Sequence, residues 1–205
     1  MKNIYKLAIL SSFILLSLTA KSQDFKTGFS LGVNTSQISG DNLSGFRQFG
    51  FYLGGFAKYE LDKDKSLQFE IIFTQKGSRK LADPEEGDFT FYNLRVNYAE
   101  VPLLYRFGVH ENIVLEVGPY VSALLSFNEE DENGTFTDLR EFNRVDVGAL
   151  FGVSYYFTER LDVNVRFTNS LIPVRSHLSG SQFRLNRGQY HTAIAFCIQY
   201  QFNAR

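Results

Sequence analysis

Residues 190–202 read YHTAIAFCIQYQF, and this stretch decides the class of fold. Large apolar side chains such as Ile194, Phe196 and Ile198 alternate with small or polar ones such as Gln199. A period of two places the two sets on opposite faces of a β-strand and does not fit a helix. The stretch therefore predicts a long strand with one apolar face.

The same alternation recurs along the rest of the chain. It covers residues 28–35, 51–59, 67–74, 92–107, 113–125, 144–155 and 161–168. No window of useful length beyond residue 23 has the helical period. The sequence thus predicts eight strands and an all-β fold.

The strand predicted at 92–107 changes phase part of the way along. Its apolar residues are even-numbered from Tyr92 to Tyr98 and odd-numbered from Val101 to Phe107. One extra residue in a strand produces such a shift, so we expect a β-bulge near Ala99.

The connections alternate in length. Those at 61–65, 108–112 and 158–160 are short, and those at 39–48, 81–91, 128–141 and 173–188 are long. This alternation predicts an up-and-down antiparallel sheet with its short turns at one end. Short periplasmic turns and long extracellular loops are typical of outer-membrane barrels.

Composition excludes several classes of protein. The 205 residues are 44% apolar and 16% aromatic, which excludes a disordered chain. A single cysteine, Cys197, excludes an internal disulfide and a cysteine-based zinc site. The formal charge of −1 gives no reason to expect nucleic acid as a partner.

The first 22 residues resemble a secretory signal peptide. Lys2 and Lys6 precede an uncharged run of twelve residues, and Ala20 and Ser22 form a small-residue cleavage site before Gln23. A membrane-spanning helix needs about 20 apolar residues, so this run is too short to be one. We expect a signal peptide at 1–22 and a single barrel domain at 23–205.

Alternation does not by itself say whether the apolar face points to the inside or to lipid. A soluble lipocalin-like binding barrel would turn it inward, and a membrane barrel would turn it outward. Three features favour the membrane barrel: strands of about 10–14 residues, an apolar phase without charges, and aromatic residues near both strand ends. We predict an eight-stranded antiparallel transmembrane β-barrel in the outer membrane, in contact with its lipid bilayer.

The charged phase then faces the lumen. Counting residues up from the short turns sorts the charges into layers, and the predicted lumen network consists of Glu70, Glu100, Glu116, Arg166, Arg106 and Arg144. The middle layer holds three of the carboxylates and Arg166. Because a guanidinium offers five donors, we expect Arg166 to pair with more than one of them.

The chain resembles the PorT-type outer-membrane β-barrel proteins of Bacteroidetes over its whole mature length. The resemblance rests on Gly32-Val33-Asn34, Ser66-Leu67-Gln68-Phe69-Glu70, Gln75-Lys76-Gly77, Asn97-Tyr98-Ala99-Glu100-Val101-Pro102-Leu103-Leu104 and Gly118-Pro119-Tyr120. The chain departs from many barrels at its C-terminus, where three residues follow Phe202. The resemblance implies a fold and a location, and in a few members a part in a secretion apparatus.

Catalytic and metal-binding motifs are not found. His110, His177 and His191 lack metal-ligand spacing. A lipid-modifying enzyme could combine His191, a serine such as Ser126 and an acid near the outer rim, but any barrel of this size offers such a grouping by chance. The acidic run at 129–132 either binds calcium, bridges to lipopolysaccharide through divalent ions, or forms a solvated loop, which is the commoner case. We expect no catalytic residue, no metal and no cofactor, and an inert Cys197.

Two functional classes remain for a membrane barrel. One is a structural or docking protein for an unknown partner, and the other is a porin-like transporter of small solutes. Eight strands leave an interior that side chains can fill, which favours docking.

Overall fold

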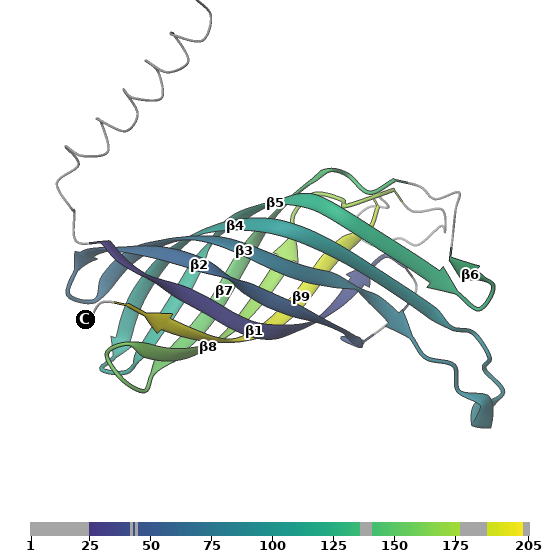
Figure 1. Cartoon of the computed structure of the whole chain (residues 1–205), viewed down its shortest axis with the longest axis horizontal. Helices are drawn as coiled ribbons and strands as arrows, with labels where there is room; N and C mark the ends of the chain where they lie inside the picture. Colours follow the sequence, from purple (N-terminus) through teal and green to yellow (C-terminus); the bar gives the residue numbers. More distant parts are fainter. Residues whose placement is uncertain (1–24, 42, 44, 136–140, 177–187, 203–205) are drawn as a thin grey trace, which may run out of the picture.

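The computed structural model describes residues 25–41, 43, 45–135, 141–176 and 188–202. The predicted signal peptide at 1–22 lies outside these residues. Figure 1 shows one barrel, with the short turns at one end and the long loops at the other. Its strands are β1 (Phe25–Ser39), β2 (Gln48–Asp62), β3 (Lys65–Lys80), β4 (Tyr92–His110), β5 (Ile113–Asp131), β6 (Gly134–Thr135), β7 (Val145–Tyr156), β8 (Leu161–Ser170) and β9 (Tyr190–Gln201).

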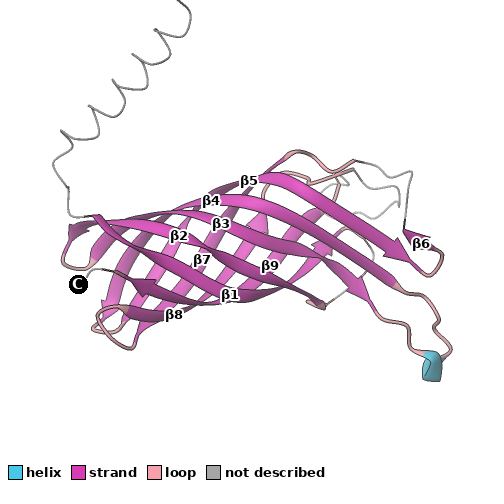
Figure 2. Ribbon diagram, in the orientation of Figure 1, coloured by secondary structure: helices cyan, strands magenta, loops and turns pink. Residues whose placement is uncertain are grey.

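Eight long strands close the barrel. Each pairs antiparallel with its neighbours in sequence, β9 returns to pair with β1, and the two-residue β6 only extends β5. The predicted eight-stranded up-and-down barrel is confirmed. Outside the strands, Figure 2 shows one short helical turn, η1 (Pro84–Glu86), in the loop between β3 and β4. Among the described residues, no helix is long and apolar enough to cross a membrane.

The apolar phase faces outward. Phe69, Phe151 and Phe196 lie in the middle parts of β3, β7 and β9 and are 45%, 50% and 51% exposed. Their chain neighbours Glu70, Gly152 and Cys197 point inward and are buried. Apolar side chains of this size are exposed in a band only where the surrounding medium is itself apolar. The lipocalin-like alternative, which needs the opposite arrangement, is therefore excluded.

The upper half of β4 differs from the prediction. Leu94, Val96 and Tyr98 point inward and are fully buried, whereas Arg95 points outward. β4 keeps one phase from Leu94 to Arg106, so the bulge predicted near Ala99 is not in this strand. The extra residue lies in β5, because the pairing moves from Asn97 with Ser126 to Tyr98 with Leu124.

The physical reason is a change of surroundings along the strand. Within the bilayer the apolar side chains face lipid, but β4 and β5 run for 19 residues each and extend past the apolar band. Beyond the band the outside of the barrel is wet, so apolar side chains are more stable inside. The apolar phase thus inverts while the strand itself continues unchanged.

Candidate functional site

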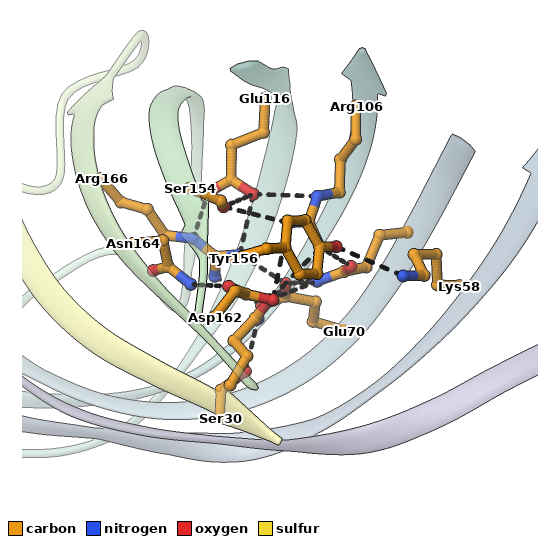
Figure 3. A network of polar contacts seen from close by, with 12 residues as sticks. Ser30, Lys58, Glu70, Arg106, Glu116, Ser154, Tyr156, Asp162, Asn164 and Arg166 are labelled. Atoms are coloured by element: carbon orange, nitrogen blue, oxygen red, sulfur yellow. Dashed lines mark hydrogen bonds and ion pairs between the residues drawn. The ribbon is translucent and has the colours of Figure 1, made fainter. Parts of the chain in front are cut away.

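The interior of the barrel is the candidate site, because most of the buried charges lie there. At its centre, Arg166 of β8 reaches across the lumen to Glu70 of β3 (Figure 3). Its two terminal nitrogens each donate to one Glu70 oxygen at 2.8 Å. Its Nε donates to Glu116 Oε1 of β5 at 2.6 Å, and Nη1 also donates to the Tyr52 hydroxyl at 2.8 Å. One guanidinium therefore joins four strands.

A glycine makes room for this cluster. Glu116 of β5, Gly152 of β7 and Arg166 of β8 lie in one register row across three strands. A Cβ on Gly152 would lie 2.5 Å from Glu116 Oε1 and 3.1 Å from Arg166 Cγ. The two long side chains pass over the space that a larger residue at position 152 would fill.

Arg106 of β4 forms a second cluster on the short-turn side. It hydrogen-bonds Gln68, donates to Ser154 Oγ at 3.0 Å, and lies 3.5 Å from Glu116 Oε2. Asp162 is a more distant partner at 3.9 Å. Glu116 is thus shared by Arg106 and Arg166, which links the two clusters into one network.

Uncharged side chains complete this network. Gln199 donates to Ser30 Oγ at 2.7 Å and to Glu70 at 3.3 Å, and it accepts from Arg106. Lys58 donates to the Tyr156 hydroxyl at 3.4 Å nearest the short turns (Figure 3). Counting charges in the sequence did not identify the glutamines, although their position on the inward phase is the signal that could have done so.

Glu100 belongs to a different cluster from the one predicted. Its Oε2 accepts from Lys76 Nζ at 2.5 Å and from Ser122 Oγ at 2.9 Å. The Lys76 ammonium also lies 4.5 Å from the centre of the Tyr120 ring. Because the strands are tilted, residues at the same number of positions from their short turns lie at different heights in the barrel. Glu100 therefore contacts Lys76 and not Arg166.

Arg144 does not lie in the lumen. It precedes the first residue of β7 and is exposed. The inward phase that the sequence predicted for it begins only at Asp146, which is fully buried. Of the six predicted network residues, the structure therefore brings five into the interior and leaves Arg144 outside.

An apolar plug closes the lumen at the long-loop end. It consists of the buried side chains of Ile38, Leu94, Val96, Tyr98, Phe142 and Val174. These residues come from two strands, β1 and β4, and from two loops. The plug was not predicted from the sequence, because the inward phase was expected to be polar along the whole barrel.

Arg175 holds the loops over this plug. Its guanidinium pairs with both oxygens of Glu129 at 2.7 and 3.0 Å, and its Nε donates to Gln189 at 2.7 Å. It also lies 4.5 Å from the centre of the Phe142 ring. Burial alone would lower the pKa of Arg175, but the hydrogen bonds and charge of Glu129 outweigh it and raise the pKa.

The acidic run predicted as a loop is partly in a strand. Glu129, Glu130 and Asp131 are the last residues of β5, and Glu129 turns inward to Arg175. Asp131 accepts from the backbone N–H of Asn133 at 2.7 Å. Within the described part of the chain, no group of three or more acidic, histidine or cysteine side chains could hold a metal ion.

The chance catalytic grouping is not assembled. His191 is buried inside the barrel, with its Nε2 3.2 Å from the Tyr98 hydroxyl, whereas Ser126 is exposed on the outer surface. The wall of the barrel separates them. Cys197 is buried on the inward phase of β9 as a free thiol.

Comparison with known proteins agrees with this architecture. The sequence pattern of a family described as "Outer membrane protein beta-barrel domain" matches residues 20–176. Comparison with curated proteins finds no match to the sequence.

Two solved structures are similar to this chain over almost their whole length. Neisserial surface protein A is 15% identical, with 87% of this chain and 97% of that chain covered and a TM-score of 0.52. Ail, the attachment invasion locus protein of Yersinia pestis, is 13% identical, with 86% and 98% covered and a TM-score of 0.49. The match to more than half of the sequence, on a closed barrel with an apolar outer surface, shows that the chain belongs to the outer-membrane protein β-barrel domain family.

Proposed function

We propose that this protein is a closed, non-conducting outer-membrane barrel that serves as a structural or docking component for a protein partner. The filled interior of the barrel supports this proposal. Arg166 bridges Glu70 and Glu116 across the lumen, and the apolar plug fills the long-loop end above them. A solute would have to break buried ion pairs and displace packed apolar side chains, which is costly in a dry interior.

The resemblance to PorT-type proteins adds a finer proposal. The partner would be a component of a secretion apparatus, bound through the long loops or through the short-turn rim.

We also propose export by a signal peptide cleaved before Gln23. N-terminal sequencing of the protein from outer-membrane fractions tests the cleavage, with Gln23 expected as the first residue. On this proposal the barrel has no catalytic activity and needs no cofactor.

Planar-bilayer recording combined with cross-linking in native cells tests the role. We expect no steady conductance from the purified protein, and one reproducible cross-linked partner in the cell. Steady conductance that small solutes modulate would contradict docking and support the alternative of a porin-like transporter. A protein that shows no conductance and also yields no partner under efficient cross-linking would contradict the docking role.

A further inference from the structure

The outer surface of β3, β4 and β5 has a polar row where the apolar band ends. Gln75 of β3 donates to Asn97 Oδ1 of β4 at 2.8 Å, and Asn97 donates to Ser126 Oγ of β5 at 2.8 Å. The same strands carry outward apolar residues below this row, such as Phe69 and Leu103. Polar side chains bonded to each other in a row mark the level at which lipid tails give way to headgroups.

Two arginines lie directly above the polar row. Arg95 pairs in register with Gly77, and Arg79 pairs with Asn93, so the two arginines are diagonal neighbours on adjacent strands. Such residues lie about 7–8 Å apart at their backbones, within reach of one shared group for side chains of this length. Both point outward and are exposed.

Among the residues that the structure describes, no carboxylate lies within ion-pair distance of the Arg79 or Arg95 guanidinium. Of the acids nearby, Asp88 pairs with Lys80 at 2.7 Å, and Glu130, which is diagonal to Arg95 in the register, accepts a hydrogen bond from the uncharged Asn128 amide at 2.6 Å.

The surroundings of the arginines suit a lipid more than a dissolved ion. On β2, which pairs with β3, Phe49 and Phe51 face outward at the same end of the barrel. Aromatic residues at this level are typical of the membrane interface, where they contact lipid beside its headgroup. Figure 1 shows β3, β4 and β5 extending together toward the long loops at this end.

From this geometry we infer that Arg79 and Arg95 bind the phosphate of a phosphorylated glycolipid in the outer leaflet of the membrane. Guanidinium groups match phosphate oxygens with paired hydrogen bonds, which an ammonium does not. The apolar band immediately below receives the acyl chains of the same lipid. The site is independent of whether the lumen conducts or of which protein partner binds.

Native mass spectrometry of the purified protein in detergent tests the site, with bisphosphorylated lipid A and its dephosphorylated form as probes. We expect the wild-type protein to prefer the phosphorylated lipid by more than about tenfold, because each hydrogen bond to a charged group contributes appreciably. The Arg79→Gln/Arg95→Gln variant should lose this preference. The variant Arg160→Gln, which removes an exposed arginine at the short-turn end, should keep it.

Three outcomes would overturn the inference. They are equal binding of the two lipids by the wild-type protein, an unchanged preference in the double variant, and displacement of the lipid by millimolar inorganic phosphate, which would mean a free-phosphate site. The different gel mobility of boiled and unboiled samples establishes that each variant is folded. The Arg79→Lys/Arg95→Lys variant, which keeps both charges, should retain part of the preference.

Discussion

Arg166 and Glu70 form a bidentate ion pair across the lumen, with both nitrogen–oxygen distances at 2.8 Å and both side chains fully buried. They come from β8 and β3, two strands that face each other across the barrel. Because the same guanidinium also binds Glu116, one cation stabilises two buried carboxylates. The stability of the barrel should depend strongly on this residue.

Replacing Arg166 by Met should lower the free energy of unfolding by about 3–5 kcal/mol, because Glu70 and Glu116 would remain buried without their cation. Urea unfolding in detergent measures this change. A water-filled lumen would screen the carboxylates, and the loss would then be below about 1 kcal/mol. That smaller loss, found together with measurable conductance, would contradict the closed barrel.

The variant Gly152→Ala should be destabilised by about 1–3 kcal/mol, since the new methyl group would collide with Glu116 and displace it from Arg166. The matched control is Gly55→Ala, on the outward phase, where the added Cβ would lie 3.6 Å from the Gly28 carbonyl oxygen, an ordinary van der Waals contact. The control should change stability by less than about 0.5 kcal/mol. Equal effects in the two variants would argue against steric crowding at Gly152.

Lys76 and Glu100 should be energetically coupled. Either Lys76→Met or Glu100→Gln leaves one buried partner of a 2.5 Å pair unmatched, at an expected cost of about 3–5 kcal/mol. The double variant removes both and should cost less than the sum of the single changes. A double-mutant cycle measures the difference, and strictly additive losses would show that the pair is not coupled.

The outward phase should not tolerate charge within the bilayer. Phe69→Arg should cost about 2–4 kcal/mol if position 69 lies near the midplane, because the guanidinium would face hydrocarbon. Leu81→Arg, in the loop after β3, is the control and should be nearly neutral. Refolding into bilayers followed by denaturant titration compares them. A tolerated arginine at position 69 would place this face in water.

Arg175→Met should destabilise the long-loop end by about 1.5–3 kcal/mol, through loss of its charged hydrogen bonds to Glu129. The exposed pair between Lys80 and Asp88 offers a comparison, since Lys80→Met should cost less than about 1 kcal/mol. Thermal unfolding of both variants at low and high salt distinguishes them. A larger salt dependence for the Arg175 variant than for the Lys80 variant would mean that the Arg175–Glu129 pair is open to solvent.

The sequence by itself determined the barrel and the side of its wall on which most residues lie. A period of two has only two phases, so the uninterrupted apolar phase of 190–202 already implies that Gln199 and Cys197 point inward. The same reasoning places Glu70, Glu116 and Arg166 in the lumen. These inferences depend only on local geometry, which successive residues of one strand share.

Tertiary structure decided which inward residues meet. Glu100 pairs with Lys76 because tilt and stagger of the strands change the height of each residue, and no single strand contains that information. Arg175 and Glu129 are 46 positions apart and meet only because the loops close over the barrel. Leu94 and Val96 point inward because their part of β4 lies beyond the lipid, and the depth of a residue in the membrane is a property of the assembled barrel.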